Sequence, residues 1–325
     1  MRLSAGLIAL STIALVATGC SAFDDSSGSD SGDSGVTVAA AFYPLAWLTG
    51  QVADGTGAEV ELLTQPGSEP HDLELGVAQT AAVSEADLVV YEAGFQPAVD
   101  DTVAQNAGGT ALDVAALADL VPMEESAEEH AEHAGEEGEE HAGEEGEEHA
   151  HEPGGLDPHF WQDPLRVAAV ADAVAAELAS LDPDHADAYR ANAEDLRADL
   201  TELDSAYASG LADCERDTIV VSHDAFGYLE KYGLHIAPIV GLSPDAEPTP
   251  AALGELQHLI EEEGITTVFS EPLKPALGEE LAADLDLSNG VLDPIEGLSD
   301  ATADEDYLSL MEANLDALRT ANGCP

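Results

Sequence analysis

Three histidines and one aspartate stand where the chain leaves an expected strand or turns sharply. They are His71 in PGSEPHDLE, His159 in LDPHFWQDP, His223 in VVSHDAF and Asp293 in VLDPI. Because the carboxyl ends of parallel strands meet at one edge of a sheet, side chains that follow different strands converge there. The four residues are therefore predicted to share one site.

Three imidazoles and one carboxylate make a nitrogen-rich ligand set. Such a set suits Zn(II) better than Mg(II) or Ca(II), which prefer oxygen ligands. A catalytic zinc would need an open position for water and a general base, for which Glu69 or Glu271 is available. With Asp293 the shell is closed, and the chain contains no HExxH, nucleophile-elbow or phosphate-loop motif. We therefore expect a zinc-binding protein that is not an enzyme. A secreted zinc hydrolase is the alternative, and a structural surface protein with incidental metal is a weaker one.

The other histidines form two groups. His185, His235 and His258 suit ordinary surface or core positions. Five more lie in a tract of Glu, Gly, Ala and His from 124 to 155, where HAGEEGEE occurs twice in tandem: His130, His133, His141, His149 and His151. Frequent glycine and dense like charge deny this tract a packed core, so we expect a disordered loop. Its histidines are predicted to be either weak auxiliary zinc ligands or part of an inert spacer.

Strand-like and helix-like segments alternate on both sides of the acidic tract. Strand candidates include VTVAAAF, AEVELLT, DLVVYEA and TALDV before it, and DTIVVSHDAF, LHIAPIVG, ITTVFSEP and NGVLDPI after it. This alternation predicts an α/β fold with two similar parallel-sheet lobes, at 36–182 and 212–325. The segment 183–211 has apolar residues at helical spacing and predicts one long rigid helix that links the lobes. The metal site is expected in the cleft between them.

The chain is strongly acidic throughout. Eight basic residues against 67 acidic ones give a formal net charge of −59, and only 14 of the acidic residues lie in the Glu-rich tract. Such a charge excludes nucleic acid and anionic membrane surfaces as electrostatic partners and favours cations. It also suits a protein kept soluble in a salty medium, where self-repulsion is screened.

The N-terminal twenty residues, MRLSAGLIALSTIALVATGC, have the pattern of a secretory signal peptide. VATGC resembles a bacterial lipobox, which makes Cys20 the expected lipidated residue, with a plain signal peptide as the alternative. The Ser-, Gly- and Asp-rich residues 21–35 would then form a flexible tether. In an oxidising compartment the remaining Cys214 and Cys324 are expected to form a disulfide, with two free thiols as the alternative.

The motifs FYPL, PGSEPHDLE, DPHFWQDP, VSHDAFGYLEKYGL, GLSPDAEPTP, FSEP and LDPI occur in this order over nearly the whole mature chain. Together they resemble the cluster A-I (ZnuA/TroA-like) metal-binding lipoproteins of bacterial ABC importers, in the zinc branch. Carried over position by position, His71, His159 and His223 match the three histidine ligands and Asp293 the carboxylate.

The resemblance implies a receptor anchored to the outer face of the cell membrane that captures Zn(II) and delivers it to a permease. A manganese or iron receptor of the same type is the alternative. We expect the protein to be a monomer.

Overall fold

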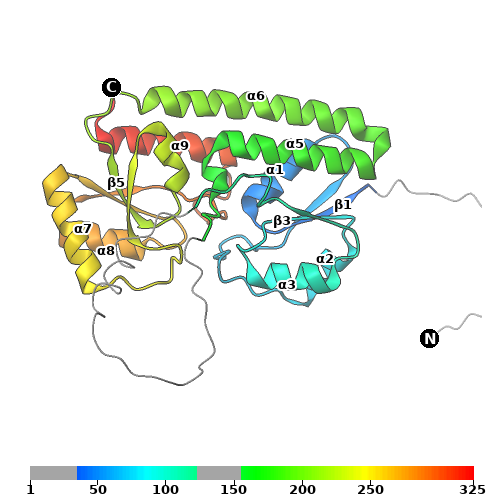
Figure 1. Cartoon of the computed structure of the whole chain (residues 1–325), viewed down its shortest axis with the longest axis horizontal. Helices are drawn as coiled ribbons and strands as arrows, with labels where there is room; N and C mark the ends of the chain where they lie inside the picture. Colours follow the sequence, from blue (N-terminus) through cyan, green and yellow to red (C-terminus); the bar gives the residue numbers. More distant parts are fainter. Residues whose placement is uncertain (1–34, 123–154) are drawn as a thin grey trace, which may run out of the picture. The chain divides into compact units, whose positions relative to one another are not determined.

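The structure is a computed structural model that describes residues 35–122 and 155–325. Residues Gly35–Pro325 belong to one compact unit (Figure 1). Its two four-stranded sheets, in which every strand pairing is parallel, confirm the predicted α/β fold with two lobes. Each of the eight strands lies at one of the segments that the sequence predicts.

The first lobe is built on a sheet of order β2-β1-β3-β4. Its strands are β1 (Thr37–Ala40), β2 (Glu59–Leu62), β3 (Leu88–Tyr91) and β4 (Thr110–Asp113). The helices between them are α1 (Tyr43–Ala53), α2 (Val77–Glu85) and α3 (Pro97–Asn106). A proline in the first turn of α1 and of α3 fits the fixed φ of a helix start. Figure 1 shows α2 and α3 on one face of this sheet and α1 on the other.

The second lobe repeats the plan with the order β6-β5-β7-β8. Its strands are β5 (Thr218–His223), β6 (His235–Val240), β7 (Thr267–Ser270) and β8 (Ser288–Val291). Its helices are η3 (Gly227–Tyr232), α7 (Pro250–Glu263), α8 (Ala276–Asp284) and α9 (Tyr307–Asn322). The Thr249 side chain caps α7 by accepting from Ala252 N, and Gly264 ends the helix at φ 64°.

Two antiparallel helices connect the lobes. After α5 (Pro164–Leu181) and the short η2 (Pro183–His185), α6 (Ala186–Gly210) runs back along α5 and spans about 37 Å at 1.5 Å per residue. It packs against α1 of the first lobe and against α9 of the second (Figure 1). Its buried face includes Tyr189, Leu196, Leu200 and Leu203, which are the positions that the helical spacing predicts.

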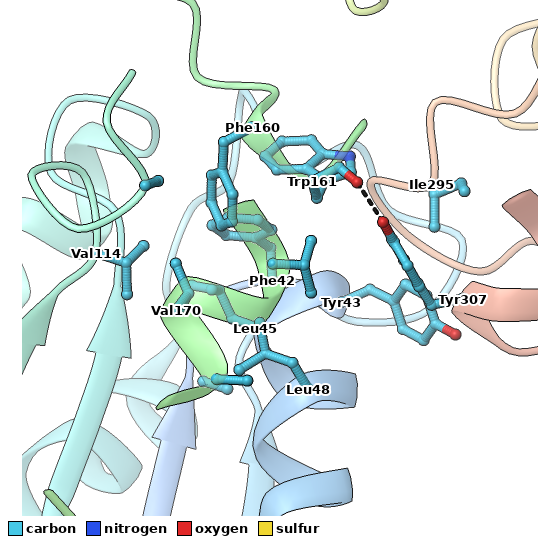
Figure 2. Close-up of a cluster of buried hydrophobic side chains, with 14 of the residues drawn as sticks. Phe42, Tyr43, Leu45, Leu48, Val114, Phe160, Trp161, Val170, Ile295 and Tyr307 are labelled. Atoms are coloured by element: carbon cyan, nitrogen blue, oxygen red, sulfur yellow. Dashed lines mark hydrogen bonds between the residues drawn. The ribbon is translucent and has the colours of Figure 1, made fainter. Parts of the chain in front are cut away.

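One continuous hydrophobic core includes residues of both lobes. Phe160 and Trp161 lie fully buried within it, and the Trp161 ring packs 5.0 Å from that of Phe42 (Figure 2). The Tyr307 hydroxyl donates to the Trp161 carbonyl at 2.5 Å. The DPHFWQDP segment is therefore fixed at the junction of the lobes, and a shared core permits only small movements between them.

The predicted disulfide between Cys214 and Cys324 is present. It joins the residues before β5 to the end of α9 and encloses a loop of 110 residues, which restricts the unfolded chain. In the described part of the chain, no helix combines the length and the apolar character that crossing a membrane requires.

Candidate metal centre

Three imidazoles and one carboxylate converge between the two lobes. His71 lies in the loop after β2, and His159 directly precedes the 3-10 turn η1 (Phe160–Gln162). His223 is the last residue of β5, and Glu296 lies in the loop after β8. One ligand atom of each side chain lies within 4.8 Å of the other three. Three of the four follow the carboxyl ends of parallel strands, which is where side chains from different strands meet.

Four of the six separations between these atoms are close to the edges of a zinc coordination tetrahedron, and the other two are at most 4.8 Å. Glu296 Oε1 lies 3.2 Å from Nε2 of His71, 3.2 Å from Nε2 of His159 and 3.1 Å from Nε2 of His223. The Nε2 atoms of His71 and His159 are 3.4 Å apart. Zn–N bonds of about 2.0–2.1 Å in a tetrahedron give ligand separations of about 3.3–3.4 Å. A zinc ion thus fits among these four atoms with small adjustments of their positions.

Asp293, the carboxylate that the sequence predicts as a ligand, lies outside the cluster. Its Oδ1 accepts a hydrogen bond from the backbone N–H of Ile295 at 2.8 Å, and the Asn314 side chain pairs with its backbone N–H and carbonyl. Burial raises the pKa of Asp293 to about 6, despite the hydrogen bond from Ile295. The structure therefore differs from the expectation: the carboxylate of the cluster belongs to Glu296, three residues further along the chain.

Two features of the loop before Glu296 orient its side chain toward the imidazoles. Ile295 has a φ of 59°, a left-handed conformation that costs a β-branched residue on the order of 1–3 kcal/mol. The Pro294 carbonyl accepts hydrogen bonds from Trp161 Nε1 and Gln162 Nε2, each at 2.7 Å. These bonds tie the loop of the carboxylate to the segment that carries His159. The sequence contains no local signal for either feature, because both depend on tertiary contacts.

Carboxylates orient two of the three imidazoles from behind. Asp157 Oδ1 lies 2.8 Å from Nδ1 of His159, and Glu271 Oε1 lies 2.7 Å from Nδ1 of His223. Each carboxylate also accepts the backbone N–H of the histidine it orients. A proton held at Nδ1 by a carboxylate leaves Nε2 as the nitrogen that can bind a metal.

The same contacts shift the protonation of the cluster. Burial lowers the pKa values of His159 and His223, but hydrogen bonds to carboxylates outweigh burial and raise them to about 9 and about 10. Burial alone would raise the pKa of Glu296, yet the hydrogen bonds from the imidazoles hold it well below its usual range. At neutral pH the metal-free cluster therefore carries protons on imidazoles beside an ionised carboxylate. A metal ion has to displace those protons.

Two further charged side chains lie beside the cluster. Glu69 accepts the backbone N–H of His71 at 3.3 Å, and burial, aided by the charge of Glu296, raises the pKa of Glu69 to about 7. Lys274 lines a cavity of about 260 Å³ that reaches His223 from the second lobe. Neither side chain contributes an atom to the four-atom cluster.

Among the described residues, the other histidines are not part of this centre. His185 pairs with Asp182 at 2.6 Å, and His235 and His258 are exposed. Cys20 and the five histidines of the acidic tract, His130, His133, His141, His149 and His151, lie outside the described residues.

Two parallel-sheet lobes with a histidine-rich cluster between them define a class of two-lobed α/β metal-binding proteins. The family model of the zinc-uptake complex component A, periplasmic, matches residues 38–321. The chain therefore belongs to the ZnuA family.

The chain is similar to named proteins and to proteins of known structure. The chain is 32% identical over 322 residues to the high-affinity zinc uptake system protein ZnuA of Bacillus subtilis, with 97% of this chain and 96% of that protein covered. It is 35% identical over 295 residues to the zinc-binding lipoprotein AdcA of Streptococcus pneumoniae, covering 88% of this chain and 56% of AdcA. The Zn(II)-bound ZnuA-like domain of S. pneumoniae AdcA matches with a TM-score of 0.69 at 29% identity, over 89% of this chain and 99% of that domain.

A pair of conservative substitutions distinguishes the two carboxylates. Glu296→Gln keeps the side-chain size but removes the charge that faces three imidazoles, so we expect zinc affinity to fall by about 100-fold or more. Asp293→Asn, its matched control, should stay within about threefold of the parent affinity because that carboxylate faces its own loop. Competition with a chelator of known zinc affinity measures both. A larger loss in Asp293→Asn than in Glu296→Gln would restore Asp293 as the ligand.

The raised pKa values of His159 and His223 predict how zinc binding depends on pH. Below about pH 9 both imidazoles hold protons in the metal-free protein, so zinc binding at pH 7 should release about two protons. Affinity should therefore rise with pH from 6 to 9 and level off above the two pKa values. Calorimetry in buffers of different ionisation enthalpy counts the released protons. Binding at pH 7 without proton release would contradict the raised values.

Proposed function

We propose that the chain captures Zn(II) on the outer side of the cytoplasmic membrane and delivers it to the permease of an ABC importer. The observation that carries this proposal is the convergence of three imidazole nitrogens on one carboxylate oxygen at 3.1–3.2 Å. Membership of the ZnuA family and the zinc-related names of the relatives support the same conclusion.

The ligand set favours zinc over manganese. Three nitrogen donors and one oxygen donor suit the borderline-soft Zn(II), whereas Mn(II) is better matched by carboxylate, carbonyl and water oxygens. Zn(II) also accepts four ligands in a tetrahedron, and the 3.1–3.4 Å separations of the cluster fit that geometry. A manganese receptor would need further oxygen ligands that the four-atom cluster does not include.

The same cluster favours a carrier over a hydrolase. A catalytic zinc keeps one position open for water, whereas four protein ligands fill a tetrahedral shell. Of the two candidate general bases, Glu271 is committed to His223 through two hydrogen bonds. The side chains of His159, His223 and Glu296 are almost completely buried. Burial of this kind suits capture of a bare ion and its later release.

The proposed location follows from the N-terminus and the family. Cys20 is the proposed lipid attachment site, with residues 21–35 as the tether that holds a monomeric receptor near its permease. Support comes from the description of the family as periplasmic and from the word lipoprotein in the name of AdcA. Cys20→Ala should move the protein from the membrane fraction to the soluble fraction. Retention of that variant in the membrane would reject the anchor.

The five histidines of the acidic tract are proposed as weak auxiliary zinc ligands that raise the local concentration of zinc near the buried site. A Gly- and Glu-rich segment can chelate only by losing conformational entropy, so each such site should be weak. Deletion of residues 124–151 should leave one tight zinc per molecule and remove only weaker equivalents in a calorimetric titration. Loss of the tight equivalent would refute this division, and an unchanged total would make the tract an inert spacer.

The function is tested by direct competition of metals. Protein purified without added metal and then dialysed against equal Zn(II) and Mn(II) should retain about one zinc per molecule and almost no manganese. The same preparation should show no hydrolytic turnover of ester or peptide substrates. His159→Ala should lose the tight zinc, whereas His185→Ala, which alters a histidine outside the cluster, should keep it. Equal or preferred retention of manganese would overturn the zinc assignment.

A further inference from the structure

The three imidazoles of the metal centre are not supported in the same way. His159 and His223 are fully buried, and each has a carboxylate on its Nδ1. The His71 side chain is 13% exposed, and no group of the described residues pairs with its Nδ1. Imidazole ligands without such a partner are less firmly oriented. The position of the His71 imidazole must therefore depend on contacts of its backbone and of neighbouring residues.

One buried amide ties the loop that carries His71 to the first lobe, in addition to the contacts of Gly67 N with the Leu298 carbonyl and of His71 N with Glu69. Gln96 is 2% exposed, and its Nε2 donates to the Pro70 carbonyl at 3.0 Å and to Thr64 Oγ1 at 3.1 Å. The Pro70 carbonyl can only accept, so the nitrogen of the amide must face it. Thr64 Oγ1 in turn donates to the Ala41 carbonyl at 2.8 Å, just beyond β1. Gln96 thus ties both ends of the segment from Thr64 to Pro70 to the first sheet.

The position of Gln96 is itself fixed. It lies at the N-cap of α3, and the turn before it is held by hydrogen bonds from Ala93 N to Asp113 Oδ1 and from Gly94 N to Asp100 Oδ2. The preceding residue, Phe95, places its ring edge-on to the His71 imidazole at 4.8 Å. The loop between β3 and α3 therefore contacts His71 through a ring and holds its backbone through an amide.

We propose that Gln96 is the positioning residue of His71, and that its hydrogen bond to Pro70 sets how fast the bound zinc is released. This inference rests on the proposed function as a zinc carrier. Loss of the amide leaves the Pro70 carbonyl with only the local hydrogen bond from Leu73 N at 3.3 Å, while His159 and His223 keep their carboxylate partners. The ion then stays on three ligands but loses the fourth more often. The first lobe would thus supply the ligand that opens during release.

The test compares two amides that each donate two hydrogen bonds. Gln96→Met removes the amide at nearly constant shape. Asn192→Leu is the matched control, because Asn192 on α6 donates to the carbonyls of Val52 and Asp54, both at 2.9 Å, away from the metal centre. Zinc transfer to an excess of chromogenic chelator, followed by stopped flow, gives the release rate. Gln96→Met loses two buried hydrogen bonds and Asn192→Leu loses two that are partly buried or exposed, so both are expected to melt at lower temperature, Gln96→Met by more.

Only Gln96→Met should release zinc faster, by about 10- to 100-fold, with one zinc still bound per molecule. Its Co(II) form should also change its visible absorption, since the d–d bands report the number and geometry of ligands, whereas the control should keep the parent spectrum. If Gln96→Met does not fold, Gln96→Asn retains the amide but is too short to reach both partners, and it should show the same direction of change.

A release rate and Co(II) spectrum in the Gln96 variant that match those of Asn192→Leu would overturn the proposal and leave Gln96 as a stabilising residue only. Failure of the zinc-carrier function would look different, because the parent protein itself would then fail to retain zinc against the chelator. That result would contradict both the zinc-carrier function and the role of Gln96.

Discussion

Burial of the Glu296 carboxylate is the constraint on which the metal centre depends. Its side chain is 1% exposed, and an uncompensated ion at such a position would cost several kcal/mol. Three imidazole nitrogens surround its Oε1 at 3.1–3.2 Å; protons on His159 and His223 supply the compensation when no metal is bound, and zinc supplies it when the metal is bound. Capture of zinc is therefore an exchange of cations around one fixed anion. The site never has to bury a bare negative charge.

The fold supplies rigidity for this exchange. Strand ends of two parallel sheets deliver ligands from opposite lobes, and a core shared by both lobes, with α6 packed across them, limits how far they can separate. The hydrogen bonds from Trp161 and Gln162 to Pro294 hold the loops of His159 and Glu296 together. Release is therefore more easily achieved by movement of one loop than by wide opening of the lobes. Among the described residues the His71 imidazole has no carboxylate on its Nδ1, unlike His159 and His223, and its loop is therefore the point of release that we propose.

Local pattern in the sequence points to three of the four side chains that the structure brings together. His71, His159 and His223 each lie at a turn or strand end, and the parallel-sheet rule is enough to bring such residues together. The lobes, the long helix and the disulfide also follow from periodicity and from cysteine count. The fourth side chain could not be found in this way. Asp293 and Glu296 follow the same strand, and the choice between them depends on the left-handed backbone of Ile295, which no local pattern predicts.

The supporting residues were also beyond the reach of the sequence alone. Asp157 lies two residues before His159, but the Glu271 and His223 pair spans 48 positions and needs the β5–β7 neighbourhood to form. Gln96 acts on a carbonyl 26 residues away, and nothing in its surroundings distinguishes it from an ordinary helix start. Such contacts are set by the packing of the folded chain. Such contacts can be identified only from the folded structure, once the pairing of the strands is known.

The most direct measurement is a crystal structure of the zinc-loaded protein with anomalous data collected on both sides of the zinc absorption edge. One full-occupancy zinc bonded to Nε2 of His71, His159 and His223 and to a carboxylate oxygen of Glu296, with bonds of about 2.0–2.2 Å, is the predicted result. A zinc bound by Asp293 in place of Glu296, or an anomalous peak away from the three imidazoles, would contradict it.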